Sequence, residues 1–129
     1  QNSDLGKLRV LVVDDDPDIL SLILMILQSM GIRDTERAMD GEAALEFFRS
    51  NPWCVDFVIC DWIMPKMNGY DVLRAFSADP SISTIPFIIM TAKSAEADIN
   101  KLLELGASAY LTKPVSIKNL LEMVGSLLE

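Results

Sequence analysis

The sequence predicts one α/β domain in which a five-stranded parallel sheet is wound by helices on both faces. Short apolar runs alternate with longer segments of helical periodicity along the whole chain, which is the pattern of repeated strand-helix units. The short runs are continuously apolar and rich in Val and Ile, as strands buried on both faces are. The chain has 129 residues, half of them apolar, which suffices for one core and leaves no room for a second domain of ordinary size.

The first unit is a strand over residues 9–13 followed by a helix. Three aspartates, residues 14–16, follow the strand, where its carboxyl end meets solvent. Asp16 is a suitable helix cap and Pro17 suits the first helical position. Apolar residues at helical spacing continue until Gly31, which predicts the end of this helix.

The later units follow the same rules. Residues 35–38 form a weaker strand, and the helix after it ends at the Asn51-Pro52 breaker. The next buried strand ends on Asp61, the following one on Thr91, and the last on Lys113-Pro114. The remaining predicted elements are strands over 57–60, 86–90 and 110–112, and helices over 41–49, 70–78, 96–105 and 117–128, the last one capped by Ser116.

Composition excludes several functions. The net charge is −8 and no Lys or Arg cluster is present, so we expect no direct binding of nucleic acid. This acidity serves either general solubility or a concentrated acidic site. The chain has no histidine, which excludes histidine acid-base chemistry, histidine-ligated metals and a role as phosphohistidine donor.

The location and the boundaries are also expectations. No stretch is long and apolar enough to cross a membrane, and residues 1–8 lack a signal pattern, so we expect no membrane insertion. Cys54 and Cys60 lie in apolar surroundings, as buried free thiols do, which favours a reducing cytoplasm. We expect residues 1–8 to be an N-terminal extension or a tag remnant, and residues 9–129 to be the functional domain.

Polar side chains at four strand ends predict the functional site. Ligand sites of such sheets lie at the carboxyl ends of the strands, where Asp14, Asp61, Thr91 and Lys113 are expected to meet, with Asp15 and Asp16 beside them. Crowded carboxylates repel unless a cation joins them, and an all-oxygen ligand set selects Mg²⁺ or Mn²⁺.

An aspartate beside such a cation can accept a phosphoryl group. Lys113 would neutralise the developing charge and Thr91 would donate a hydrogen bond, so the set indicates aspartyl phosphate chemistry. The simpler alternative is that each strand merely ends in a polar residue.

Four segments carry a family resemblance: LVVDDDPDI, VICDWIMPKMNGYDVL, PFIIMTAK and GASAYLTKPV. In sequence and spacing they resemble the receiver domain of response regulators in two-component systems, over residues 9–128. The DW-x-MP-x-M-x-G loop and the Tyr-x-x-Lys-Pro ending are most similar to those of chemotaxis-type single-domain receivers. The resemblance implies a flavodoxin-like fold with strand order 2-1-3-4-5 and five helices.

The resemblance also implies roles for single residues. Asp61 would be the phosphoryl acceptor; Asp15, Asp61 and the backbone carbonyl of Ile63 would bind Mg²⁺ directly, and Asp14 would act through water. Lys113 would contact the phosphoryl group. Pro114 matches a proline whose preceding bond is usually cis, which would aim that lysine.

The implied switch pair is Thr91 and Tyr110. The hydroxyl would turn toward the phosphoryl group, and the aromatic ring would move inward into the space vacated. The lifetime of the phosphorylated state is expected to depend on Ile63 and Lys93, where receivers vary.

The implied function is a phosphorylation-dependent signalling switch and not a dedicated enzyme. The domain would promote its own aspartyl phosphorylation and dephosphorylation. The donor would be a histidine kinase or a histidine phosphotransfer protein, and the output a change in binding to a downstream target. The domain would act as a monomer or a phosphorylation-dependent dimer.

Two other functions compete with this interpretation. A phosphohydrolase of the haloacid dehalogenase type also uses a strand-end aspartate, but it needs Thr or Val where Asp18 stands, and it normally has a longer chain. A receiver-like module that binds partners without phosphorylation has lost side chains of the site, whereas here every one is present.

Helical spacing suggests a docking surface on the first helix. The residues that suffice to cover the sheet are Ile19, Leu22, Ile23, Ile26, Leu27 and Met30. Leu20, Leu24 and Met25 remain as an apolar flank beside the acidic site, and we expect the kinase to dock there. The alternative is that a neighbouring helix covers them.

Overall fold

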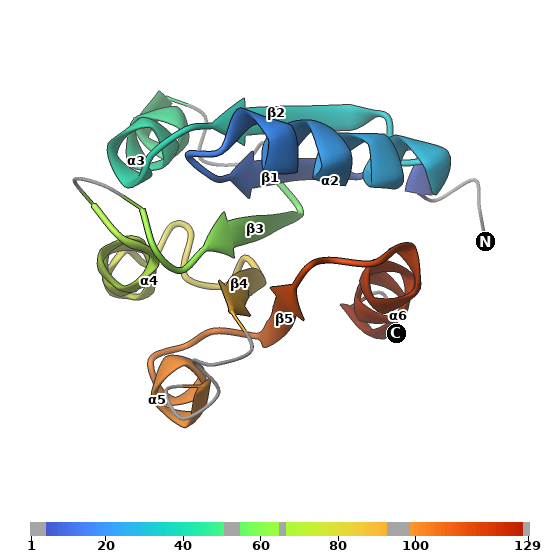
Figure 1. Ribbon diagram of the computed structural model, residues 1–129. Coiled ribbons are helices and arrows are strands. Elements are labelled where there is room, and N and C mark those ends of the chain that lie inside the picture. Colours follow the sequence, from blue (N-terminus) through green and yellow to red (C-terminus); the bar gives the residue numbers. More distant parts are fainter. Residues whose placement is uncertain (1–4, 51–54, 65–66, 93–98, 128–129) are drawn as a thin grey trace.

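The computed structural model of the chain describes residues 5–50, 55–64, 67–92 and 99–127. Within them, parallel strands form one sheet in the order β2-β1-β3-β4-β5, which confirms the predicted fold class and strand order. Figure 1 shows this order from one edge of the sheet to the other. The strands are β1 (Arg9–Val13), β2 (Asp34–Ala38), β3 (Phe57–Asp61), β4 (Phe87–Ala92) and β5 (Ala109–Lys113).

The helices connect these strands. Those of ten residues or more are α2 (Pro17–Ser29), α3 (Gly41–Ser50), α4 (Gly69–Ala78) and α6 (Ile117–Leu127). The fifth, α5, is described only over Ile99–Glu104, because its predicted start lies outside the described residues. The other predicted elements are all found, with ends displaced by at most two residues.

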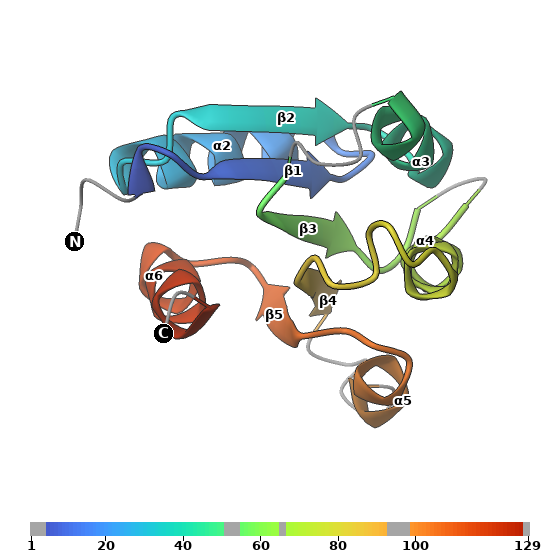
Figure 2. The same cartoon turned by 180° about the vertical axis from the view of Figure 1, so that it is seen from behind.

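Two apolar layers fill the space between the sheet and the helices. Alternate residues of each strand point to opposite faces, so Val10 and Val12 pack with α2 and α6, whereas Leu11 and Val13 pack with α3 and α4. In Figure 1 α2 lies in front of β1, and in Figure 2, seen from behind, it lies beyond it. The layer of α3 and α4 also contains edge-to-face ring contacts among Phe48, Phe76 and Phe87.

The predicted orientation of α2 is wrong at two positions. Leu22, expected to cover the sheet, is 41% exposed, whereas Leu20, expected on the docking flank, is 1% exposed and lies in the core. This helix is apolar on most of its circumference, so its sequence contains two overlapping apolar stripes. Leu20 is therefore excluded as a docking residue, while Leu24 is partly buried at the edge of the core and Met25 is exposed.

Two further sequence expectations concern the cysteines and the membrane. Cys60 is a buried free thiol, as predicted, whereas Cys54 and Lys93 lie outside the described residues. Among the described helices, none combines the length and apolarity that crossing a membrane requires.

Candidate phosphorylation site

The sheet register brings the predicted polar residues together at the carboxyl ends of the strands. Asp61 is the last residue of β3 and pairs with Met90 of β4, so it lies next to Thr91. Thr91 pairs with Thr112, and Lys113 ends β5 one position further on. Asp14 follows β1 directly, and its N–H donates to the carbonyl of Ala38 (3.1 Å). The parallel strands therefore deliver these side chains to the same place.

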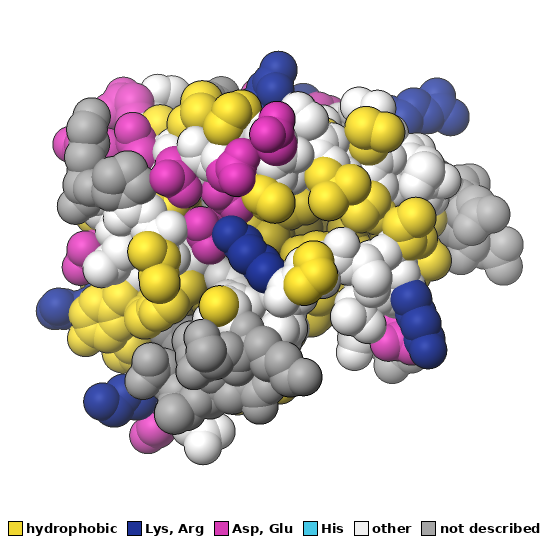
Figure 3. Space-filling model, in the orientation of Figure 1, with side chains coloured by type: hydrophobic (Ala, Val, Ile, Leu, Met, Phe, Trp, Pro, Cys, Tyr) yellow, Lys and Arg dark blue, Asp and Glu magenta, His cyan; other side chains and the backbone are white. Residues whose placement is uncertain are grey.

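Lys113 joins the two buried carboxylates of the site. Its Nζ lies 2.9 Å from Asp61 Oδ1 and 3.3 Å from Asp14 Oδ2. Asp14 and Asp61 are both buried, and Lys113 is partly buried. Figure 3 shows acidic side chains gathered beside a basic side chain near the middle of this face.

A third carboxylate completes an acidic cluster. One carboxylate oxygen each from Asp14, Asp15 and Asp61 lies within 4.8 Å of the others. Asp15 is exposed, so the cluster is open to solvent on that side. Three carboxylates and one ammonium leave a formal charge of −2 when all four groups are ionised. An oxygen-only set with this charge excess fits a hard divalent cation such as Mg²⁺ or Mn²⁺.

The pKa values show how unevenly this charge is compensated. Burial raises the pKa of the Asp14 carboxyl, and the charge of Asp61 adds to the effect, against the Asp16 N–H and Lys113, which lower it. Burial lowers the pKa of the Lys113 ammonium, but its hydrogen bond to Asp61 and the charges of Asp61 and Asp14 outweigh burial and raise it. Burial and the same two carboxylates raise the pKa of the Cys60 thiol, so it stays protonated.

The three consecutive aspartates have different tasks. The Asp16 N–H donates to Asp14 Oδ1 (2.9 Å), which orients the buried carboxylate. The Asp16 side chain in turn accepts from the Asp18 N–H (2.9 Å) and caps α2, as the sequence predicts. Asp16 is therefore committed to the helix, and Asp14 and Asp15 remain for the acidic cluster.

The predicted switch pair lies on the two last strands. Thr91 is buried, and its hydroxyl makes a long hydrogen bond (3.4 Å) to the carbonyl of Ala92. Tyr110, one strand away, is exposed. The Lys113–Pro114 peptide is cis, as the resemblance implies.

Trp62 and Ile63, which follow Asp61 in the chain, lie at the mouth of the site. Trp62 forms an edge-to-face contact with Tyr70 of α4 (6.0 Å between ring centroids). Ile63 is a large apolar residue that is 71% exposed.

Sequence reasoning missed Gly69, which lies against the backbone of Asp61 and Trp62. The motif containing this glycine is visible in the sequence, but its contact with the acceptor strand depends on how α4 packs.

The chain belongs to the response regulator receiver domain family, whose model matches residues 10–125. It is therefore a receiver domain of two-component signalling, as its fold and acidic site indicate.

Relatives from several bacteria support this assignment. The chemotaxis protein CheY of Pseudomonas aeruginosa is 32% identical over 95% of this chain and 97% of that protein. The receiver domain of the Francisella response regulator 1452 is 35% identical over 94% of this chain and 96% of that one, with a TM-score of 0.82. The receiver domain of a signal transduction histidine kinase from Syntrophus aciditrophicus is 33% identical over 93% and 89%, with a TM-score of 0.82.

Proposed function

We propose that the chain is a phosphorylation-dependent switch that accepts a phosphoryl group on Asp61. The observation that carries this proposal is the ion pair between Asp61 and Lys113 beside Asp14 and Asp15. This arrangement presents a carboxylate nucleophile, a cation for the transferred group and oxygen ligands for a metal. Asp15, Asp61 and the Ile63 carbonyl would hold Mg²⁺ or Mn²⁺, with Asp14 acting through water. When bound, the metal supplies positive charge to the phosphoryl oxygens.

The transfer step needs only a proton from solvent besides the two proteins. An Asp61 carboxylate oxygen attacks phosphorus and forms a P–O bond as the P–N bond of the phosphohistidine donor breaks. The electron pair of that bond stays on the imidazole nitrogen, which takes a proton from solvent. Lys113 stays paired with the reacting group because its raised pKa keeps it charged. Water reverses the modification by hydrolysing the acyl phosphate. We therefore regard the domain as a switch that promotes its own modification, and not as a dedicated enzyme.

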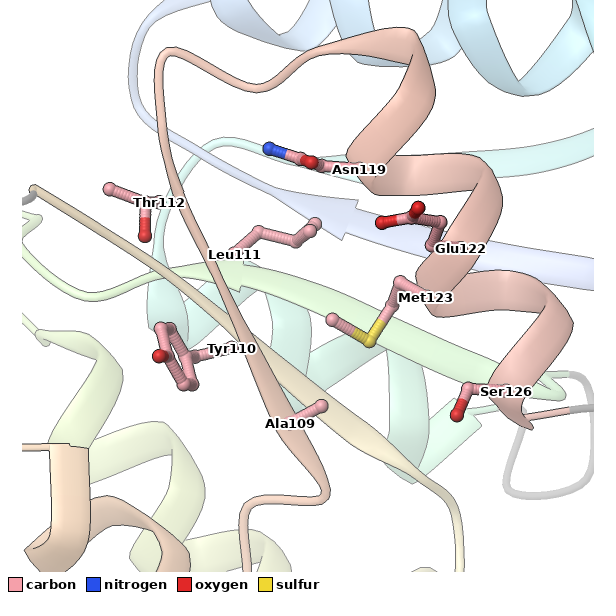
Figure 4. A pocket seen from close by; sticks show the side chains of 8 residues that line it. All are labelled: Ala109, Tyr110, Leu111, Thr112, Asn119, Glu122, Met123 and Ser126. Atoms are coloured by element: carbon pink, nitrogen blue, oxygen red, sulfur yellow. The ribbon is translucent and has the colours of Figure 1, made fainter.

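The conformational change would be transmitted from Thr91 to Tyr110. The Thr91 hydroxyl gives up little when it turns toward a phosphoryl group, because its present hydrogen bond is long. The ring of Tyr110 would then move inward to fill the vacated space. Tyr110 also lines an open groove of about 430 Å³ between β5 and α6. Figure 4 shows that the Tyr110 side chain points away from α6, whereas the Leu111 side chain, on the other side of β5, points toward α6. Movement of this ring would change the exposed surface of β5 on the side away from α6, and a downstream target would respond to that change.

The expected donor is a histidine kinase or a histidine phosphotransfer protein, and it must reach Asp61 past the start of α2. We propose that it docks on the remaining flank, the exposed Met25 and the partly buried Leu24. The similarity to CheY suggests a chemotaxis-like output. We expect the exchange to take place in a reducing cytoplasm, with which the buried free thiol of Cys60 agrees. A monomer or a phosphorylation-dependent dimer remains the expected form.

Incubation with acetyl phosphate tests the proposal. With Mg²⁺ the protein should gain a single phosphoryl mass, and with a chelator it should gain none. The same preparation should release no more than one equivalent of product from p-nitrophenyl phosphate. Sustained turnover would instead favour the phosphohydrolase, and absence of any mass gain would favour a module that does not use phosphorylation.

A further inference from the structure

The first residue of α4 lies directly against the backbone of the proposed acceptor. A Cβ atom at Gly69 would lie 2.7 Å from the carbonyl oxygen of Asp61 and 2.9 Å from the Cα of Trp62. The carbonyl oxygen of Trp62 would be 3.1 Å away. All three neighbours are backbone atoms, so no side chain can rotate to make room. Any substitution at Gly69 must therefore displace either the start of α4 or the end of β3.

The start of α4 is held by several contacts. Asn68 caps the helix, with its side chain accepting from the Asp71 N–H (3.0 Å). The Gly69 N–H donates to the carbonyl of Trp62 (2.8 Å), which closes the loop onto the strand end. The helix then buries Val72, Leu73 and Phe76 in the core. Moving α4 away would expose this apolar surface and break the hydrogen bond to Trp62.

The end of β3 is held from the other side. Asp61 pairs with Met90 in the sheet, and the Trp62 N–H donates to the carbonyl of Met90 (2.9 Å). The side chain of Asp61 is in turn paired with Lys113. The acceptor peptide is thus enclosed between β4 and the first turn of α4.

We propose that Gly69 is a positioning residue for the acceptor: its missing side chain lets the first turn of α4 fix the backbone of Asp61 and Trp62. This inference rests on the proposed function, because positioning matters only if Asp61 reacts. An added methyl group at Gly69 should displace the Asp61 carboxylate from Lys113 and the other two aspartates. The Mg²⁺ affinity and the rate of phosphorylation should then fall in Gly69→Ala by more than in a variant that loses the same stability elsewhere in the fold.

Gly69→Ala tests this when it is compared with Gly106→Ala. Gly106 has φ +119°, and a Cβ there would lie 2.9 Å from Ser77 Oγ, so its replacement strains the fold before the start of β5, away from the acidic cluster. Both variants should melt at lower temperatures than the parent. Gly69→Ala should also label with acetyl phosphate about tenfold to a hundredfold more slowly, as a displacement of about 1 Å at a reacting group does. Calorimetric titration should show weaker Mg²⁺ binding for Gly69→Ala and parental binding for Gly106→Ala.

A milder pair covers the case in which Gly69→Ala does not fold. Asn68→Ala removes the cap of α4 without adding an atom and should weaken Mg²⁺ binding. Ser116→Ala, which removes the hydroxyl that accepts from the Asn119 N–H in α6, should not. Parental Mg²⁺ affinity in both Gly69→Ala and Asn68→Ala, or in Asn68→Ala alone if Gly69→Ala is unfolded, would overturn the positioning role. A parent protein that binds no Mg²⁺ and gains no phosphoryl mass would overturn the proposed function itself, and this inference with it.

Discussion

Two ion-pair clusters lie at opposite ends of the same sheet. At the amino end, Arg9 pairs with Asp34 at 2.8 Å, and their side chains are 35% and 44% exposed. At the carboxyl end, Lys113 pairs with Asp61 and Asp14, whose side chains are 9% and 0% exposed. In the first cluster the Arg9–Asp34 pair is in contact with water, and the Arg9 backbone N–H also donates to the Asp56 carboxylate (2.8 Å). The second holds more negative charge than its lysine can compensate.

This difference separates a structural pair from a reactive one. An exposed ion pair contributes at most about 1 kcal/mol, because water and salt screen it. Buried charges cost free energy unless they are compensated, so the carboxyl end gains most from a bound cation. Such an arrangement does not optimise the stability of the metal-free fold, which is expected for a functional site.

The largest contrast should come from removing each cation. Lys113→Met leaves two buried carboxylates without their partner and should cost about 2–3 kcal/mol, below the range for a fully buried pair. It should also slow acetyl phosphate labelling about a hundredfold, as loss of one charge-stabilising group does. Arg9→Met should cost less than about 1 kcal/mol and label normally. Urea unfolding and intact mass measure both effects, and equal losses in the two variants would remove the distinction between the clusters.

Mg²⁺ should stabilise the protein through the carboxyl end alone. At a hundred times its Kd, the cation should add about 2.7 kcal/mol to the free energy of unfolding, with a corresponding rise in melting temperature. Asp15→Asn should raise the melting temperature of the metal-free protein, because it relieves repulsion, and should largely abolish the response to Mg²⁺. A response equal to that of the parent would show that Asp15 is not a principal ligand.

The stability of the metal-free protein should depend on pH through Asp14. Folding raises the pKa of this carboxyl, so folding favours its protonated form. The stability that Asp14 contributes is fully present below the pKa that its carboxyl has in the unfolded chain. It is lost as pH rises through the higher pKa that this carboxyl has in the folded protein. Urea unfolding from about pH 4 to about pH 7 covers this range for an aspartate with an ordinary pKa of about 3.9.

Asp14→Asn should remove this part of the pH dependence, while its amide oxygen can still accept from the Asp16 N–H. Excess Mg²⁺ should oppose the loss of stability in the parent, because the cation binds the ionised carboxylates. An unchanged slope in Asp14→Asn would assign the pH dependence to another group.

The smallest effect is expected at the mouth of the site. Ile63 is exposed and cannot hold an attacking water by hydrogen bonding. Ile63→Asn should therefore change the rate of dephosphorylation only a few-fold, which corresponds to less than about 1.4 kcal/mol of barrier. Decay of the phosphorylated mass over time measures this rate. Identical decay in both proteins would show that this side chain has no influence.

Features that depend on local sequence patterns could be predicted, whereas features that depend on the packing of whole helices could not. Asp61, Thr91 and Lys113 end apolar runs and Asp14 follows one directly, and the carboxyl ends of parallel strands meet, so local patterns sufficed to assemble the site. The prediction of which face of α2 is buried was wrong because Leu20 and Leu22 belong to overlapping apolar stripes. Only packing in the folded protein selects one of these stripes. Gly69 could not be placed either, since its contact with Asp61 depends on the docking of a whole helix.

The most direct test of Asp61 as the phosphoryl acceptor neutralises one carboxylate from each cluster. Asp61→Asn and Asp34→Asn each replace an aspartate that is paired with a cation, at the carboxyl and the amino end of the sheet. After incubation with acetyl phosphate and Mg²⁺, intact mass should show one phosphoryl group on the parent and on Asp34→Asn, and none on Asp61→Asn. Persistent labelling of a folded Asp61→Asn protein would contradict the assignment of Asp61 as the acceptor.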